Sequence, residues 1–124
     1  MQKLSLTLAI TCLLIFTSAV QSASVGDTET GIAAYYSNVF QGRRTASGER
    51  YDKNAYTAAH KRLPYGTRIR ITNLENDKSV VVKINDRGPR SKKRMLDVSR
   101  RAAQDLGFIQ KGLTKVRLEV IEAP

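Results

Sequence analysis

The residues best suited to chemistry follow an apolar run in the second half of the chain. Residues 79–83 (Ser-Val-Val-Val-Lys) lead into residues 84–89 (Ile-Asn-Asp-Arg-Gly-Pro), which brings an amide, a carboxylate and a guanidinium together. Val and Ile favour extended backbone, whereas a Gly-Pro pair ends a strand. We therefore expect a strand that presents Asn85, Asp86 and Arg87 at its exit.

Strand alternation predicts where the Asp86 carboxylate lies. Strict alternation puts Asp86 on the same face as Val82 and Ile84, at the rim of the core. Asn85 and Arg87 then lie on the opposite face. Desolvation at such a rim raises a carboxyl pKa, and a carboxyl that keeps its proton near neutral pH can act as a general acid. An Asp that merely caps a turn is the alternative.

Two further residues fit carboxylate chemistry assisted by a histidine. Glu49 lies in a loop rich in turn-forming residues, and His60 ends a short extended segment. A solvated loop acid and a structural histidine remain open alternatives for these two positions. With one histidine, one cysteine and no Gly-x-Ser-x-Gly or phosphate-loop motif, the sequence predicts no metal site, no cofactor and no serine-histidine catalysis.

The elements that must position these residues are short strands. Ser99 and Gly107 can cap a single helix over residues 100–106. Closing a small sheet into a barrel removes its exposed edges, so we expect a mainly β, closed barrel with one short helix rather than a sandwich. The expected strands cover residues 32–36, 56–60, 68–72, 79–83, 95–98 and 115–121.

The N-terminus indicates export. Residues 1–22 have a basic start, a long apolar run and small residues before the end, the layout of a cleaved signal peptide. Residues 23–30 are small and polar and are expected to form a flexible leader, followed by one domain over residues 31–122. Cys12 lies inside the apolar run, preceded by Ala-Ile-Thr, a poor match to a lipidated cysteine, so lipoprotein anchoring is not expected.

The charge balance points to a polyanionic partner. The whole chain carries +10, and since Lys3 is the only charged residue among residues 1–22, the processed chain carries +9. Such a balance draws a protein to polyanions without choosing among them, and export disfavours nucleic acid. Basic residues crowd the region around Asp86, which suits a glycan that bears carboxylates. These residues are Lys83, Arg87, Arg90, Lys92, Lys93 and Arg94.

Several motifs, in order, resemble the RlpA-like (rare lipoprotein A) domain family. They are residues 42–49 (Gly-Arg-Arg-Thr-Ala-Ser-Gly-Glu), 57–60 (Thr-Ala-Ala-His), 72–74, 81–89 and 96–99 (Leu-Asp-Val-Ser). The resemblance covers nearly all of the chain after the signal peptide. It implies a six-stranded double-psi β-barrel, which agrees with the strands expected above.

The resemblance also implies a site and a reaction. Asp86 corresponds to the catalytic acid, and Glu49 and His60 to supporting residues of the catalytic site. The implied reaction is endolytic lytic transglycosylation of peptidoglycan: the acid protonates the β-1,4 bond between N-acetylmuramic acid and N-acetylglucosamine, and the 6-hydroxyl of the muramic acid closes a 1,6-anhydro ring. Naked glycan strands are one candidate preference.

Four further residues are expected to bind the glycan. They are Tyr36, Thr57, Asn85 and Arg87, of which Arg87 suits a lactyl carboxylate. The expected protein is a monomer in the periplasm or outside the cell, without membrane insertion after processing.

Two other classes of protein remain open. A non-catalytic, expansin-like module could use the same barrel to bind or loosen a glycan, because fold does not settle function. A basic secreted protein that binds nucleic acid or anionic membrane would show steep salt dependence for any polyanion. The set of Asp86, His60 and Glu49 argues against a binding module, because such a module has no need for a proton donor.

Overall fold

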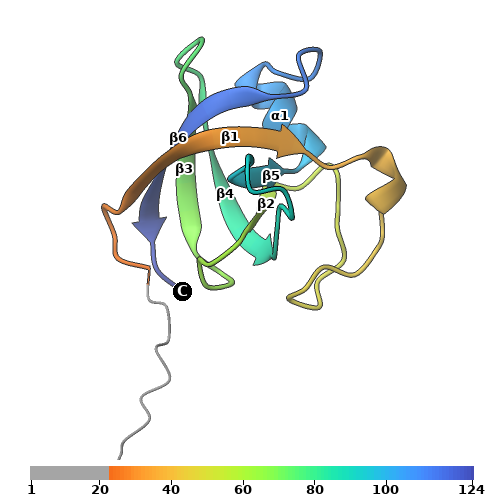
Figure 1. Cartoon of the computed structure of the whole chain (residues 1–124). Coiled ribbons are helices and arrows are strands. Elements are labelled where there is room, and N and C mark those ends of the chain that lie inside the picture. Colours follow the sequence, from red (N-terminus) through yellow and green to blue (C-terminus); the bar gives the residue numbers. More distant parts are fainter. Residues whose placement is uncertain (1–22) are drawn as a thin grey trace, which may run out of the picture.

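The chain folds into a closed barrel of six strands with one short helix (Figure 1), as the sequence predicts. The computed structural model describes residues 23–124, and the predicted signal peptide lies outside the described residues. The strands are β1 (Thr28–Tyr35), β2 (Thr57–His60), β3 (Arg68–Asn73), β4 (Ser79–Asp86), β5 (Leu96–Val98) and β6 (Thr114–Glu122); the helices are the single 3₁₀ turn η1 (Asn38–Phe40) and α1 (Arg100–Leu106).

The order of strands around the barrel is β1-β5-β2-β4-β3-β6, which closes back onto β1. The β1–β5 and β2–β4 pairs are parallel, and the other pairs are antiparallel. Parallel neighbours require long crossovers. The loop between β1 and β2, drawn in yellow on the right of Figure 1, connects two strands that lie on either side of β5, and it extends beyond the barrel.

The first strand starts earlier than predicted. Residues 28–30, assigned from the sequence to a flexible leader, belong to β1 and pair with residues 117–119 of β6. Just before them, the backbone N–H of Gly26 donates to the carbonyl of Val120 at 2.8 Å. The small polar residues gave no apolar signal, but β6 offers a complete ladder of backbone partners, and pairing with it orders the segment.

The core fills the barrel and the space under the helix. Alternating residues of β3, β4 and β6 point inward, as the burial of Ile71, Ile84 and Leu118 shows. The helix is anchored by its cap: the Ser99 hydroxyl accepts a hydrogen bond from the backbone of Ala102 at 3.2 Å. The barrel therefore gives a rigid frame for the strand ends that carry polar residues.

Residues 23–124 lack two kinds of feature, a membrane-spanning helix and a metal-ligating cluster. None of the helices there has the length and apolar character needed to cross a membrane. No group of three or more His, Cys, Asp or Glu side chains in this part of the chain is arranged to hold a metal ion.

Candidate functional site

An open groove of about 810 Å³ runs along the ends of β1, β2, β4 and β5 and the loop after β1. Its lining combines aromatic rings, two carboxylates and five arginines. The aromatic residues are Tyr35, Tyr36 and Phe40, the carboxylates Asp86 and Asp97, and the arginines Arg43, Arg44, Arg87, Arg90 and Arg94. Aromatic rings and hydrogen-bonding groups suit a sugar, and the arginines suit an anionic one.

Hydrogen-bond donors hold the Asp86 carboxylate from both sides. Its Oδ1 accepts hydrogen bonds from the backbone N–H groups of Ala46 at 2.8 Å and Arg87 at 2.9 Å. Its Oδ2 accepts a hydrogen bond from the Tyr36 hydroxyl. These three bonds fix the orientation of the carboxylate at the wall of the groove.

Asp86 reaches the groove through a β-bulge that strict alternation did not predict. Ala58 of β2 pairs with Ile84, but the next residue, Ala59, pairs with Asp86, so that Asn85 is the extra residue on β4. Asn85 is buried, and Asp86 lies opposite Ala59, facing the groove rather than following Ile84 toward the core. The predicted parity of these positions was therefore wrong, because a bulge re-aims the side chain.

Tyr36 joins Asp86 to the aromatic wall of the groove. Its ring stacks on that of Tyr51 at 4.4 Å between centroids, and it meets the ring of Phe40 edge-on. Burial and the hydrogen bond to Asp86 raise the pKa of Tyr36 well above its usual value. The Tyr36 hydroxyl thus stays protonated and remains a donor to Asp86.

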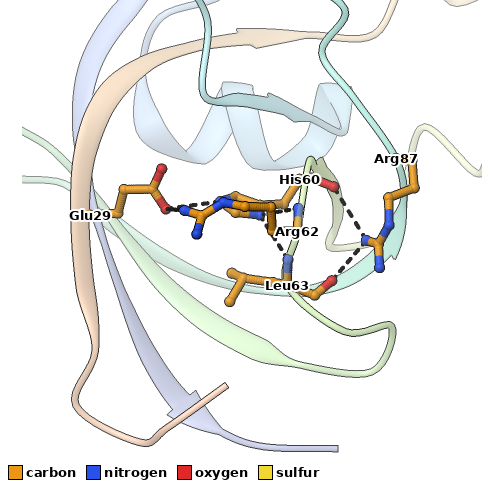
Figure 2. Close-up of polar contacts among 5 residues, drawn as sticks. All are labelled: Glu29, His60, Arg62, Leu63 and Arg87. Atoms are coloured by element: carbon orange, nitrogen blue, oxygen red, sulfur yellow. Dashed lines mark hydrogen bonds and ion pairs between the residues drawn. The ribbon is translucent and has the colours of Figure 1, made fainter. Parts of the chain in front are cut away.

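Arg87 is held by the turn that follows β2 (Figure 2). Its guanidinium donates to the carbonyls of His60 at 3.3 Å and Leu63 at 2.8 Å. It also stacks over the ring of Tyr65, with 4.2 Å from the guanidinium carbon to the ring centroid. These contacts place a positive charge in the groove beside Asp86.

His60 organises this turn and does not face Asp86. Its Nδ1 accepts hydrogen bonds from the backbone N–H groups of Arg62 and Leu63, each at 3.0 Å (Figure 2). Nε2 therefore carries the proton and donates to Glu29 at 3.0 Å. Burial lowers the pKa of His60, the charges of Arg62 and Arg87 lower it further, and Glu29 opposes them.

The surroundings of His60 separate its side chain from the Asp86 carboxylate. Its side chain is 2% exposed and lines a smaller hollow of about 240 Å³ with Glu29, outside the groove that contains Asp86. With both ring nitrogens engaged, His60 has no free nitrogen for proton transfer to a substrate. The carbonyls of His60 itself and of Leu63, in the turn whose N–H groups His60 binds, accept hydrogen bonds from the Arg87 guanidinium.

Glu49 and Thr57 both lie beside Lys83 of β4. The Glu49 carboxylate pairs with the Lys83 ammonium at 2.9 Å, and Lys83 is the register partner of Thr57. Neither residue lines the groove with Asp86. The same loop also contacts β4 directly, because Ser47 N–H donates to the carbonyl of Asn85 at 3.3 Å. Of the predicted site residues, the structure thus brings together Tyr36, Asp86 and Arg87.

Sequence reasoning missed several residues of the groove. Asp97 lies between buried Leu96 and Val98 on β5, so its side chain points out of the barrel. The alternation of this short strand and the family motif at residues 96–99 were the available signals. Arg43 and Arg44 come from the loop after β1, and only the fold brings them beside Asp86.

The closed six-stranded barrel and its groove define a double-psi β-barrel domain. The family described as "Lytic transglycolase" matches residues 28–118, and the chain belongs to the RlpA-like members of this family. The resemblance seen in the motifs is thereby confirmed.

The curated relatives are longer proteins. The "Endolytic peptidoglycan transglycosylase RlpA" of Neisseria meningitidis is 53% identical over 94 residues, which cover 76% of this chain and 39% of that protein. The protein of the same name from Pasteurella multocida is 50% identical over 97 residues, covering 78% of this chain and 33% of the relative. The chain therefore spans between a third and two fifths of the length of these relatives.

Solved structures with low sequence identity share the fold. The Streptomyces papain inhibitor matches with a TM-score of 0.64 and 19% identity, over 79% of this chain and 97% of the inhibitor. An expansin from Clavibacter michiganensis matches with a TM-score of 0.62 and 21% identity, over 79% of this chain and 52% of the expansin. At such identities the likeness shows the barrel alone.

Proposed function

We propose that this domain is an endolytic peptidoglycan lytic transglycosylase acting on the β-1,4 bond between N-acetylmuramic acid and N-acetylglucosamine. The observation that carries the proposal is the fixed Asp86 carboxylate in a groove lined by aromatic rings and arginines. The relatives named above carry the same activity in their names.

The arginines explain why this glycan would be chosen. A peptidoglycan strand stripped of its peptides bears a lactyl carboxylate on every second sugar. Arg87, whose position is fixed by the turn and by Tyr65, can bind such a carboxylate, and the other groove arginines raise the local positive potential. A preference for naked strands is part of this proposal.

The simplest chemistry uses one carboxyl for both proton transfers. Asp86 would protonate the glycosidic oxygen as the bond to C1 breaks, and its carboxylate would then take the proton of the muramic acid 6-hydroxyl as that oxygen attacks C1. No water is consumed, so the second carboxylate that glycoside hydrolases use to position water or to attack is not required. The intramolecular attack gains from proximity.

The other residues support this site. Tyr36 orients the carboxylate and gives a sugar an aromatic surface, and His60 acts as a positioning residue through Arg87. The Glu49–Lys83 pair lies beside the 45–49 loop, whose Ala46 N–H binds Asp86. We assign Glu49, Thr57 and Asn85 to holding this loop and strand end rather than to contact with the reacting bond.

The experiment compares the processed protein with Asp86→Asn on peptidoglycan stripped of stem peptides. Mass spectrometry of the soluble products detects 1,6-anhydromuramyl ends. We expect release by the unaltered protein and a loss of at least about 100-fold in Asp86→Asn, since a general acid or base typically contributes 10²–10⁴-fold.

Asp105→Asn is the matched control, because Asp105 pairs with Arg101 and Tyr56 on the helix side of the molecule. It should retain full activity. If the unaltered protein pellets with the glycan but releases no anhydro products, the enzyme proposal fails, and the expansin-like binding module takes its place.

A further inference from the structure

Two of the basic residues that follow Asp86 in the chain lie outside the groove. Lys92 and Lys93 line the hollow of about 240 Å³ between β1, the turn after β2 and the loop after β4. This basic hollow combines five cationic side chains with a single carboxylate, that of Glu29. The cations are Lys61, Arg62, Lys92, Lys93 and Arg94.

Two of these five cations already face a carboxylate of the fold. The Arg62 guanidinium lies 3.4 Å from Glu29, as Figure 2 shows. The Arg94 guanidinium lies 3.5 Å from Asp97. Each of these pairs joins one positive and one negative charge, so the two arginines add little net charge to the hollow.

The three lysines keep their positive charge. None of Lys61, Lys92 and Lys93 forms an ion pair within the part of the chain that the structure describes. The Lys61 ammonium donates to the carbonyl of Ser91 at 2.9 Å, and the Ser91 hydroxyl accepts a hydrogen bond from the backbone N–H of Lys93 at 3.2 Å. Ser91 thus ties all three lysines to one turn. A concave surface lined by one sign of charge focuses the potential on whatever enters it.

Arg94 joins the basic hollow to the groove, because its side chain lines both. A ligand held in the groove can therefore reach the hollow across one side chain. The volume of the hollow is below the roughly 300–1,000 Å³ of a site that holds a whole small molecule. It suits one anionic branch of a longer ligand.

We infer that the basic hollow is a second anion subsite, in which Lys61, Lys92 and Lys93 bind a carboxylate of the peptidoglycan strand that lies in the groove. The inference rests on the proposed function and adds to it a contact away from the reacting bond. The carboxylate comes either from the lactyl group of another muramic acid or from a stem peptide. Both sources present the same chemistry, an oxyanion facing ammonium groups.

An anionic membrane is the competing partner for a group of lysines. Surfaces that bind membranes combine cations with exposed apolar side chains that enter the lipid. The large apolar side chains of the hollow are Ile32 and Met95, and neither is exposed. The hollow therefore offers charge without an apolar face, which favours the strand.

The position of the hollow predicts which kinetic constant it controls. Its lining does not include Asp86. A contact that is the same in the ground state and the transition state changes KM and leaves kcat unaltered. The lysines of the hollow should thus act on binding alone.

The test removes two charges from the hollow and, in a matched control, two charges from elsewhere. The variant is Lys92→Gln with Lys93→Gln, and the control is Arg70→Gln with Lys78→Gln. All four side chains are exposed. Arg70 belongs to β3, which lies across the barrel from β5, and Lys78 to the loop after β3.

Four ligands separate the possible partners. They are naked glycan strands, strands with stem peptides, naked strands whose lactyl carboxylates are converted to neutral methylamides, and vesicles of anionic phospholipid. Pelleting at about 0.05 M salt, where charges are weakly screened, gives Kd. Release of anhydromuramyl ends gives KM and kcat.

We expect the lysine variant to raise Kd and KM by about three- to tenfold on a carboxylate-bearing strand, as for the loss of two exposed ion pairs. Its kcat should stay within about twofold of the unaltered protein. On the methylamide strands the two proteins should bind equally. Weakening on naked strands assigns the lactyl carboxylate, and weakening only on peptide-bearing strands assigns the stem peptide.

Three outcomes would overturn the inference: equal Kd values for the lysine variant and the control, weaker binding that persists on the methylamide strands where lactyl carboxylates were assigned, and an effect on phospholipid vesicles alone. Melting temperatures check that both variants fold, and Lys61→Gln is a second variant expected to act in the same direction. An unaltered protein that binds strands without releasing anhydro ends rejects the proposed function, whereas the ratio of Kd values still decides the role of the hollow.

Discussion

One side-chain hydroxyl joins two backbone N–H groups in orienting the Asp86 carboxylate. Tyr36 donates to Asp86 Oδ2, while its ring is fixed by stacking on Tyr51. Because the ring is held by packing and not by the hydroxyl, the two contributions of Tyr36 can be separated. Removing only the hydroxyl tests whether the orientation of Asp86 matters for the reaction.

We therefore expect Tyr36→Phe to lower kcat by about 10-fold or more, since a hydrogen bond to a charged group contributes about 1.5–3 kcal/mol. The melting temperature should change little, because the stacked ring remains. Tyr56→Phe is the matched control: its hydroxyl also donates to a carboxylate, that of Asp105, away from the groove. The rate of anhydromuramyl release and thermal unfolding measure the two effects, and equal rates for both variants would contradict the role given to Tyr36.

At the scale of elements, the turn after β2 links the buried His60 to the groove. Neutral His60 accepts two backbone hydrogen bonds at Nδ1, and the carbonyls of this turn hold Arg87 (Figure 2). Protonation of Nδ1 would break both backbone bonds. Protonation of His60 is therefore unfavourable in the folded protein. Burial also lowers the pKa of His60 below the 6.5 of a free side chain.

This shift gives stability a pH dependence with a defined sign. Between the lowered folded pKa and about 6.5, the unfolded chain binds a proton at His60 and the folded chain does not. The free energy of unfolding should thus be highest above pH 6.5 and fall as the pH drops through this window. Urea unfolding at a series of pH values measures it.

His60→Gln is the variant for comparison. It should be less stable than the unaltered protein at pH 7.5, because it cannot reproduce the ring's two acceptor contacts, and the difference should shrink toward acid pH. A difference that stays constant with pH would contradict the assignment of His60 as a buried neutral acceptor.

At the scale of the whole molecule, the positive charge is shared between the groove and other parts of the surface. The chain carries +10 in total, and five arginines line the groove that holds Asp86. β6 lies across the barrel from β2 and also carries exposed cations, among them Lys115 (Figure 1). The location of a charge, rather than the total, should decide how strongly the protein binds an anionic glycan.

We expect Arg90→Glu to weaken pelleting with naked glycan strands several-fold at about 0.05 M salt, and the effect to shrink at about 0.5 M, where charges are screened within a few ångströms. Lys115→Glu makes the same change of charge away from the groove and should have little effect. Equal weakening by both variants would indicate binding through net charge alone.

The amino-acid sequence alone determined the architecture, because periodicity and turn chemistry are local. Alternating apolar residues marked the strands, Ser99 and Gly107 marked the helix ends, and ordered motifs identified the family. The sequence did not predict the first three residues of β1 as a strand, since they have no apolar pattern and are ordered by pairing with β6.

Only the tertiary structure decided which polar groups meet. A bulge at Asn85, visible only in the pairing with β2, turns Asp86 to the groove. Barrel closure places Asp97 on the other side of Ala59 and leaves His60 buried against Glu29, because neighbouring strands in the barrel are distant in sequence. Residue types and spacing indicate which side chains could take part in chemistry. Strand order and register determine which of these side chains share a site.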